Sequence, residues 1–315
     1  YSHETDDVPN DTRSFLFQDS VKWFGLSSGL LKISPYAPVK WKYYSSKNGF
    51  KDVPVTSLIL KGNDLFIGTD GEGLYRLNTK TEKFTKEYLT TSYLSKNVYK
   101  LVGYLNDLWV AIEGGLFKIN YNTRSIEQYN TLSGLKHNTV FDAIRLTDGT
   151  IVLGSHSNEL VYIKDGSISF QMVEDNDQLM DIVSIEVDKE GKLWLATLGN
   201  GVFKQEADSF AHITVKQGLK SDYCYSIVLD GYGGAWVGHR GGLSRISESS
   251  LKIEVFDSKK GIPDDFNKNA VFNDKNGYVW FGTNKRTIKF NKKKYTKNVN
   301  PPLVSVKNVF ISDVK

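Results

Sequence analysis

The stretch Leu108-Trp109-Val110-Ala111, followed by Gly114-Gly115-Leu116-Phe117-Lys118-Ile119, decides the fold, because the same phrase returns throughout the chain. Seven copies occur, with anchor residues at positions 23, 66, 109, 152, 194, 236 and 280. Successive copies are therefore 42 to 44 residues apart. The copies anchored at Val152 and Trp280 depart most from the phrase. A fixed period of this size indicates a repeat architecture.

Each copy predicts a meander of four antiparallel strands. An apolar segment such as 140–144 precedes the anchor, a turn such as Asp148-Gly149 joins the two, and a polar segment such as 125–129 closes the copy. Four strands in about 40 residues, repeated seven times, predict an all-β, seven-bladed β-propeller of four-stranded antiparallel blades. A solenoid of the same units is the competing architecture.

A small residue stands two positions after every anchor, which predicts a tight contact between neighbouring blades. These residues are Gly25, Gly68, Ala111, Gly154, Ala196, Gly238 and Gly282.

The seventh copy has no clear fourth strand, because the segment 292–299 is basic and irregular. Tyr1-Ser2-His3 resembles the strand end at 255–257. We therefore predict that the N-terminal strand completes the last blade, which would remove a free sheet edge. The predicted propeller spans residues 1–298.

Composition excludes several classes of protein. A net charge of +4 over 315 residues is too small for a nucleic-acid face, so no nucleic-acid partner is expected. No window approaches about 18 apolar residues, so membrane attachment would need parts outside this chain. The five histidines lack metal-ligand spacing, and no metal or cofactor is expected. The single cysteine, Cys224, lies in an apolar segment and is expected to be buried. Because the chain begins with Tyr1, we expect it to be a piece of a longer protein.

The phrase Trp280-Phe281-Gly282-Thr283, the phrase Gly242-Leu243-Ser244-Arg245-Ile246 and the Asp-x-x-Gly turns resemble the two-component regulator propeller repeat. Connectors such as Gln217-Gly218-Leu219 are similar to the linkers of that family. Asn300-Pro301-Pro302-Leu303 resembles the entry to the three-tyrosine β-sandwich that follows these propellers, so residues 299–315 are expected to be a linker and its first strand.

The resemblance covers nearly the whole chain and implies a function. Members are periplasmic ligand-sensing ectodomains of bacterial hybrid two-component systems, often for glycans, ahead of a membrane helix and a histidine kinase. The resemblance also implies a homodimer formed through the missing sandwich domain.

Candidate ligand-binding residues lie in loops that are predicted to share one face of the ring. Polar, varied loops on a repeated framework are the usual place for binding, and sugars need aromatic platforms with fork-like polar groups. The candidates are His239, Arg240, His156, Asn158, Glu113 and Asn200 from the hairpin loops, with Tyr223 and Tyr93 from the inter-blade loops.

Three functions remain open. The first is a sensor that binds an oligosaccharide or other small ligand without turnover, so that this chain is not an enzyme and has no catalytic residues. The second is a scaffold for protein interaction or dimerisation. The third is a propeller lyase or hydrolase, for which only His156 and His239 are candidate catalytic histidines.

Overall fold

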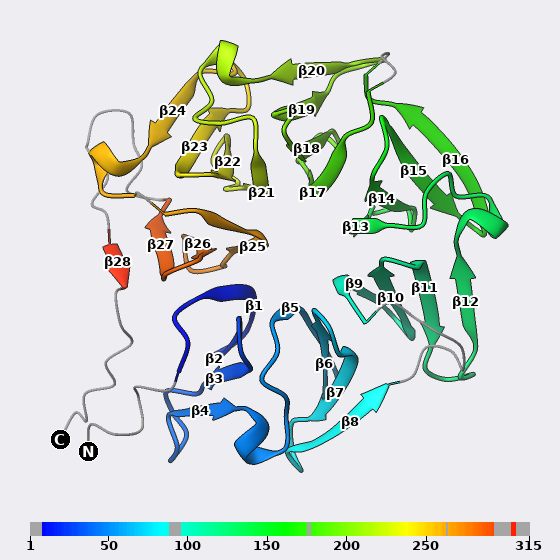
Figure 1. The fold of residues 1–315 in the computed structure, drawn as a ribbon, viewed down its shortest axis with the longest axis vertical. Coiled ribbons are helices and arrows are strands. Elements are labelled where there is room, and N and C mark those ends of the chain that lie inside the picture. Colours follow the sequence, from blue (N-terminus) through cyan, green and yellow to red (C-terminus); the bar gives the residue numbers. More distant parts are fainter. Residues whose placement is uncertain (1–7, 88–95, 175–177, 263, 293–303, 307–315) are drawn as a thin grey trace.

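The computed structural model is a ring of seven β-sheets arranged around a central axis (Figure 1). It describes residues 8–87, 96–174, 178–262, 264–292 and 304–306. Each sheet has four antiparallel strands in chain order, and the first strand of each lies innermost. The predicted seven-bladed β-propeller is confirmed.

The blades follow one another along the chain. Blade 1 has β1 (Thr12–Gln18), β2 (Val21–Leu26), β3 (Leu30–Ile33) and β4 (Trp41–Tyr44), and blade 2 has β5 (Val55–Lys61), β6 (Asp64–Thr69), β7 (Gly73–Asn78) and β8 (Lys83–Glu87). Blade 3 has β9 (Val98–Tyr104), β10 (Asp107–Ile112), β11 (Gly115–Asn120) and β12 (Ile126–Tyr129). Blade 4 has β13 (Val140–Arg145), β14 (Ile151–Ser155), β15 (Glu159–Lys164) and β16 (Ser167–Met172). Blade 5 has β17 (Asp181–Val187), β18 (Leu193–Leu198), β19 (Val202–Gln205) and β20 (Phe210–Ile213). Blade 6 has β21 (Cys224–Leu229), β22 (Gly234–His239), β23 (Gly242–Ser247) and β24 (Ile253–Phe256). Blade 7 has β25 (Phe266–Asn273), β26 (Tyr278–Thr283), β27 (Thr287–Asn291) and β28 (Val304–Val306).

The small residue after each anchor lets neighbouring blades touch, as predicted. A methyl group added at Gly25 would lie 2.6 Å from the carbonyl oxygen of Val55 in the next blade. One added at Gly154 would lie 2.5 Å from the carbonyl oxygen of Ile182. Even an alanine side chain at these two positions must push two backbones apart, so glycine is required there, whereas blades 3 and 5 accommodate Ala111 and Ala196.

The aspartate of the Asp-x-x-Gly turn does more than form the turn. In blade 6, Asp230 accepts a hydrogen bond from the indole nitrogen of the anchor Trp236 at 2.9 Å. Asp274 accepts one from Trp280 at 2.7 Å in blade 7. The motif therefore joins the turn to the buried anchor of the following strand.

Polar side chains on the inner strands bind neighbouring blades together. Ser14 donates to the carbonyl of Val55 (2.8 Å), and Ser57 accepts from the amide of Leu101 (3.0 Å). Ser184 accepts from Ile227 in the same way (3.2 Å). Such bonds therefore join blades 1 and 2, blades 2 and 3, and blades 5 and 6.

Four connectors between blades contain a single 3₁₀ turn with a common design. The turns are η1 (Ser46–Asn48), η2 (Thr131–Ser133), η3 (Val215–Gln217) and η4 (Ser258–Lys260). A polar side chain caps each start, and a left-handed glycine with φ between 82° and 112° ends each one. The apolar residue after that glycine is buried, as for Leu135 and Leu219. None of the helices in the described residues is long and apolar enough to cross a membrane.

The ring closes differently from the prediction. The fourth strand of blade 7 is β28, from the C-terminal side of the chain, and it pairs with β27. The expectation that an N-terminal strand fills this place is therefore corrected, and residues 1–3 lie outside the described residues. The predicted β-sandwich over 299–315 stays a prediction, because only 304–306 of that range are described.

Blade 1 instead meets blade 7 through side chains. Asn267 donates to the carbonyl of Thr12 (2.8 Å), and the hydroxyl groups of Thr12 and Thr287 lie 2.8 Å apart. The ring of Phe17 packs edge-on against Trp280, with centroids 5.1 Å apart. We call this contact the closing seam.

Candidate functional site

Two sets of loops meet on one face of the ring, which we call the loop face. They are the turns between the second and third strands of the blades and the connectors from one blade to the next. Backbone hydrogen bonds join the two sets, from Ser157 to Met180 (2.9 Å) and from Gly199 to Asp222 (3.0 Å). The prediction that these loops share one face is confirmed.

Tyr223 and Arg240 are neighbours on the loop face. The amide of Arg240 donates to the carbonyl of Tyr223 at 3.3 Å. Arg240 is exposed, and 51% of Tyr223 is exposed. The Tyr223 ring lies beside Gly199, where an added methyl group would sit 3.8 Å from it. An exposed aromatic residue next to an exposed arginine is a combination of residue types that suits a sugar or another polar ring.

Glu113 is exposed in the corresponding turn of blade 3. It accepts a hydrogen bond from the side-chain amide of Asn97, 3.4 Å away. Tyr99 lies near Glu113, at the start of the inner strand β9. Burial of its phenol raises the pKa of Tyr99, and the negative charge of Glu113 raises it further. Its ring packs edge-on against Phe141 of the next blade at 5.5 Å.

His156 is half exposed in the turn of blade 4. Its Nδ1 atom lies 2.6 Å from a carboxylate oxygen of Asp181, at the start of the next blade. The ring of His137 packs edge-on against it, with centroids 5.9 Å apart. Asp181 therefore fixes the orientation of an imidazole whose other edge is available on this face.

His239 is not in a loop, which corrects the sequence-based placement. It is the last residue of β22, and none of its surface is exposed. Its Nδ1 atom lies 3.4 Å from the Sγ atom of Cys224, which is buried as predicted. Burial lowers the pKa of His239 to about 3 and raises that of the Cys224 thiol, so both groups are neutral core residues.

Asn158 and Asn200 lie towards the outer strands. The backbone oxygen of Asn158 accepts from Val173, just after β16, at 2.9 Å. That of Asn200 lies 2.7 Å from Nε2 of His212 in β20. Asn200 still adjoins Gly199, which lies beside the Tyr223 ring, so Asn158 alone of these two is separated from Tyr223 and Arg240. Tyr93 lies outside the described residues.

Sequence reasoning missed the aromatic residues on the inner strands. Tyr99 and Tyr225 each occupy the extra residue of a β-bulge at the loop-face end of the innermost strand. Phe141 has the same place in blade 4. Aligning the copies on their anchors would have shown an aromatic residue eleven positions earlier in blades 4 and 6, and Tyr99 stands ten positions before its anchor. Bulges commonly direct side chains towards sites.

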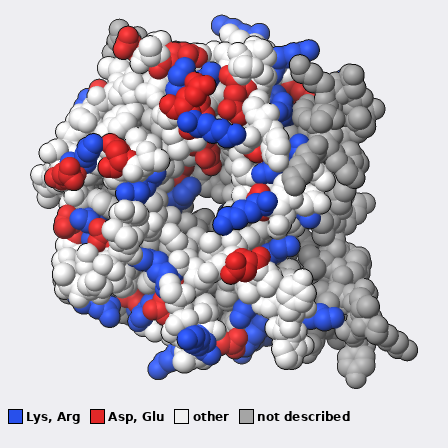
Figure 2. Space-filling view, turned by 180° about the vertical axis from the view of Figure 1, so that it is seen from behind, with Lys and Arg blue, Asp and Glu red and all other residues white. Residues whose placement is uncertain are grey.

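Figure 2 shows charged side chains of both signs around the central opening of the ring. Lys100 replaces the serine of other blades and pairs with Asp142 at 2.8 Å. Asp142 is fully buried and also accepts from the amide of Ile185 at 2.7 Å. Burial raises the pKa of nearby Glu186 to about 7, with Lys100 opposing and Asp142 adding to the shift.

Replacing Glu186 with glutamine is expected to make stability less dependent on pH. The carboxyl of Glu186 binds its proton more tightly in the folded state (pKa about 7) than in the unfolded state, so wild-type stability falls as pH rises from about 4.5 to about 7. Denaturation at about pH 8 should show a free energy of unfolding about 1–3 kcal/mol higher for the variant than for the wild type. This difference should fall towards zero near pH 4. A constant difference across this range would contradict the raised pKa.

Within the ranges that the structure describes, no three His, Cys, Asp or Glu side chains are grouped to hold a metal ion.

Comparison with known proteins agrees with this architecture. The family model described as Two component regulator propeller matches residues 261–285. The chain is 23% identical to Histidine kinase P4 of Formosa agariphila over 314 residues, which cover 91% of this chain and 23% of that protein. The chain therefore spans less than a quarter of that relative's length.

Two solved structures share the fold. The extracellular domain of the putative one component system BT4673 from B. thetaiotaomicron has a TM-score of 0.73 at 18% identity, covering 91% of this chain and 38% of that one. Virginiamycin B lyase from Staphylococcus aureus has a TM-score of 0.72 at 15% identity, covering 90% and 96%. At these identities the likeness shows the fold alone. Together, the ring of seven blades and the matched repeat identify this chain as a β-propeller that carries the two-component regulator propeller repeat.

Proposed function

We propose that this chain is the periplasmic ligand-sensing propeller of a two-component signalling protein and binds a carbohydrate or similar small ligand on the loop face without turnover. The matched repeat, the histidine kinase relative and the extracellular domain of similar fold support this proposal. The full-length protein would then be a sensor histidine kinase that reaches the membrane, and dimerises, through parts outside this chain.

The observation that carries the proposal is the pairing of Tyr223 with Arg240 on a rigid ring. The blades repeat one framework, while the exposed loop residues differ between blades, as with Glu113 in blade 3 and His156 in blade 4. Tyr223 would offer its exposed ring to a sugar, and the neighbouring exposed Arg240 would offer guanidinium donors to the sugar's hydroxyl groups. Such a platform beside a polar fork is the usual basis of sugar recognition.

Screening the chain by thermal unfolding against a panel of oligosaccharides is expected to give a saturable rise in melting temperature with at least one of them, because a ligand that binds only the folded state stabilises it. Tyr223→Ala and Arg240→Ala should each weaken that binding about tenfold or more in calorimetry. Asn158→Ala is the matched control, since Asn158 lies towards the outer strands.

Unchanged affinity in both Tyr223→Ala and Arg240→Ala would exclude this part of the loop face as the site. No shift with any oligosaccharide would favour the alternative of an interaction or dimerisation scaffold, which needs no small-molecule site.

One observation keeps an enzyme as a second candidate. The close contact of His156 with Asp181 is the kind that orients a general base. The buried His239 cannot assist it, so a lyase or hydrolase would depend on His156 alone among the two predicted histidines. Product formation from an oligosaccharide that is abolished by His156→Ala would support the enzyme and exclude a pure sensor.

A further inference from the structure

Every blade has a β-bulge at the loop-face end of its innermost strand. In blades 1 to 6 the pairing register skips one residue there, and the skipped residues are Arg13, Thr56, Tyr99, Phe141, Val183 and Tyr225. The framework is thus constant at this position while the side chain differs from blade to blade. Bulges redirect side chains and are common beside binding sites. We call this circle of six residues, together with Lys268 of blade 7, the axial mouth.

Blade 7 has a longer bulge, which reaches across the central opening. Four residues, 267–270, stand opposite Gly282 there. The strand β25 that carries them lies against β17 of blade 5, although blade 6 stands between these blades in the chain. The ammonium nitrogen of Lys268 lies 5.9 Å from the centre of the Phe141 ring in blade 4. Side chains from distant parts of the ring therefore meet at the axial mouth.

The bulge of blade 7 is held by blade 1. Asn267 donates to the carbonyl of Thr12 at 2.8 Å and also to the side chain of Asp11. The next residue, Lys268, is exposed and has no carboxylate partner within the part of the chain that the structure describes. The closing seam therefore fixes the backbone that carries Lys268, while the ammonium group keeps its donors for a ligand.

Aromatic residues form one side of the axial mouth. The rings of Tyr99 and Phe141 pack edge-on at 5.5 Å, and both residues are partly exposed. Burial raises the pKa of Tyr225, and the charge of Asp265 adds to this shift while that of Arg240 opposes it. The phenol of Tyr225 is therefore within range of the Arg240 charge, so the axial mouth adjoins the part of the loop face that carries Arg240.

Charges of both signs surround the axial mouth, which disfavours a charged ligand. Burial raises the pKa of Tyr99, and three carboxylates raise it further: Glu113, Asp70 and Asp181. An acidic sugar would be repelled by these carboxylates, and an amino sugar would be repelled by Lys268. Hydroxyl groups both donate and accept hydrogen bonds, so a neutral sugar can use the ammonium group and the carboxylates together.

We propose that the axial mouth binds the terminal ring of a neutral oligosaccharide, which packs against Phe141 and Tyr99 and accepts hydrogen bonds from Lys268. This inference rests on the proposed function, and it names the ligand class and the inner end of that binding site. The remaining sugar units would pass Tyr225 towards Arg240. Because Lys268 and Phe141 belong to blades 7 and 4, the ligand would join distant parts of the ring.

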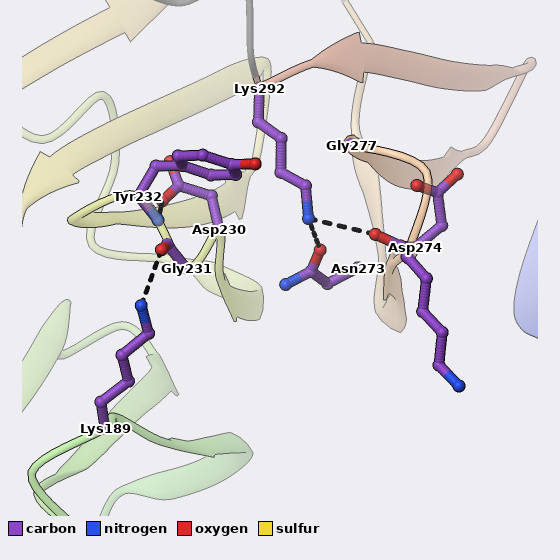
Figure 3. A pocket seen from close by; sticks show the side chains of 9 residues that line it. Lys189, Asp230, Gly231, Tyr232, Asn273, Asp274, Gly277 and Lys292 are labelled. Atoms are coloured by element: carbon purple, nitrogen blue, oxygen red, sulfur yellow. Dashed lines mark hydrogen bonds between the residues drawn. The ribbon is translucent and has the colours of Figure 1, made fainter.

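The opposite end of the ring provides a matched control for charge (Figure 3). A cleft of about 350 Å³ lies there, between the turns that join the first and second strands of blades 5, 6 and 7. In Figure 3, Lys189 donates to the carbonyl of Gly231, at 2.9 Å. Lys189→Ala therefore removes a lysine far from the axial mouth.

Tyr104 provides the matched control for an aromatic residue. It lies on the same strand as Tyr99, at the other end of β9. It also carries a cation on its ring, since the guanidinium carbon of Arg145 lies 3.3 Å from the ring centre. Tyr104→Ala therefore removes a similar contact from the face opposite the loop face.

Calorimetry on the 315-residue chain tests the inference with cellotriose, laminaritriose and xylotriose as neutral probes and trigalacturonate as an acidic one. At least one neutral trisaccharide should bind, and trigalacturonate should bind about tenfold more weakly or worse. Lys268→Ala and Phe141→Ala should each weaken the neutral binding about tenfold or more. Lys268 is exposed, so Lys268→Ala should keep the melting temperature of the wild type. Lys189→Ala and Tyr104→Ala should bind like the wild type.

Wild-type affinity in both Lys268→Ala and Phe141→Ala would overturn the axial mouth as a binding site, and loss of binding in Tyr223→Ala would then leave the proposed function standing. Equal affinity for trigalacturonate would overturn the neutral ligand class. If none of the neutral trisaccharides binds, the inference is also overturned, and a melting-temperature shift with another oligosaccharide would still support the proposed function.

Discussion

Replacing Gly282 with valine is expected to lower the free energy of unfolding by about 3 kcal/mol or more, since it wedges the closing seam open. A methyl group at this position would lie 2.0 Å from the carbonyl oxygen of Thr12 and 2.8 Å from its carbonyl carbon. It would also lie 3.0 Å from the Cβ atom of Ala270. Because the obstacle is backbone, no rotamer change relieves it. Urea denaturation followed by tryptophan fluorescence measures the effect.

Two variants at the same repeat position serve as controls. At Gly68 an added methyl group meets the side chain of Val98 at 2.6 Å, which can turn aside, so Gly68→Ala should cost less than Gly282→Ala. Ala111→Gly removes a methyl group without a clash and should cost only about 1 kcal/mol. A Gly282→Val protein as stable as the wild type would show that the ring does not depend on this contact.

The periodic part of the fold could be predicted because the same packing constraints act on every copy of the repeat. An anchor strand buried between two blades must be apolar on successive residues, and a close backbone contact requires glycine or alanine two residues later. These constraints repeat every 42 to 44 residues, so they are visible without an alignment.

The closure of the ring could not be predicted, because it has no repeated signal. The strand β28 has only three residues, Val304–Val306, and follows a basic segment of the chain. A short edge strand is specified by the backbone groups it pairs with and only weakly by its own side chains. The similarity of the N-terminal residues to another strand end was therefore insufficient to identify the fourth strand of blade 7.

The sequence-based placement of one candidate residue, His239, was wrong by one position. His239 stands three residues after its anchor and His156 stands four after its own, so the true equivalent of His239 is Ser155. Residues three after the anchor are buried in the structure, as Thr69 and Ser155 show. Arg240 stands four residues after its anchor, as His156 does, so Arg240 and not His239 reaches the loop face.

Asp230→Ala is expected to destabilise the protein by about 3–5 kcal/mol, because it removes one partner of a buried charge pair and several hydrogen bonds at once. Asp230 is 2% exposed and pairs with Arg245 at 3.2 Å. It also accepts from Trp236 at 2.9 Å, and its second oxygen accepts from the amides of Tyr232 (2.7 Å) and Gly234 (3.0 Å). The variant therefore loosens the turn, the anchor and the third strand of blade 6 together.

Asp188→Ala provides the comparison that isolates the buried pair. Asp188 caps its own turn in the same way, but it lies 3.4 Å from the indole nitrogen of Trp194 and is more exposed than Asp230. Its loss should cost about 1–2 kcal/mol in the same urea titration. The loss of stability in Asp230→Asn should lie between those of Asp188→Ala and Asp230→Ala. The amide keeps an acceptor for the turn but removes the charge that faces Arg245. Equal costs for Asp188→Ala and Asp230→Ala would mean that the turn alone, and not the contact with Arg245 and Trp236, stabilises the blade.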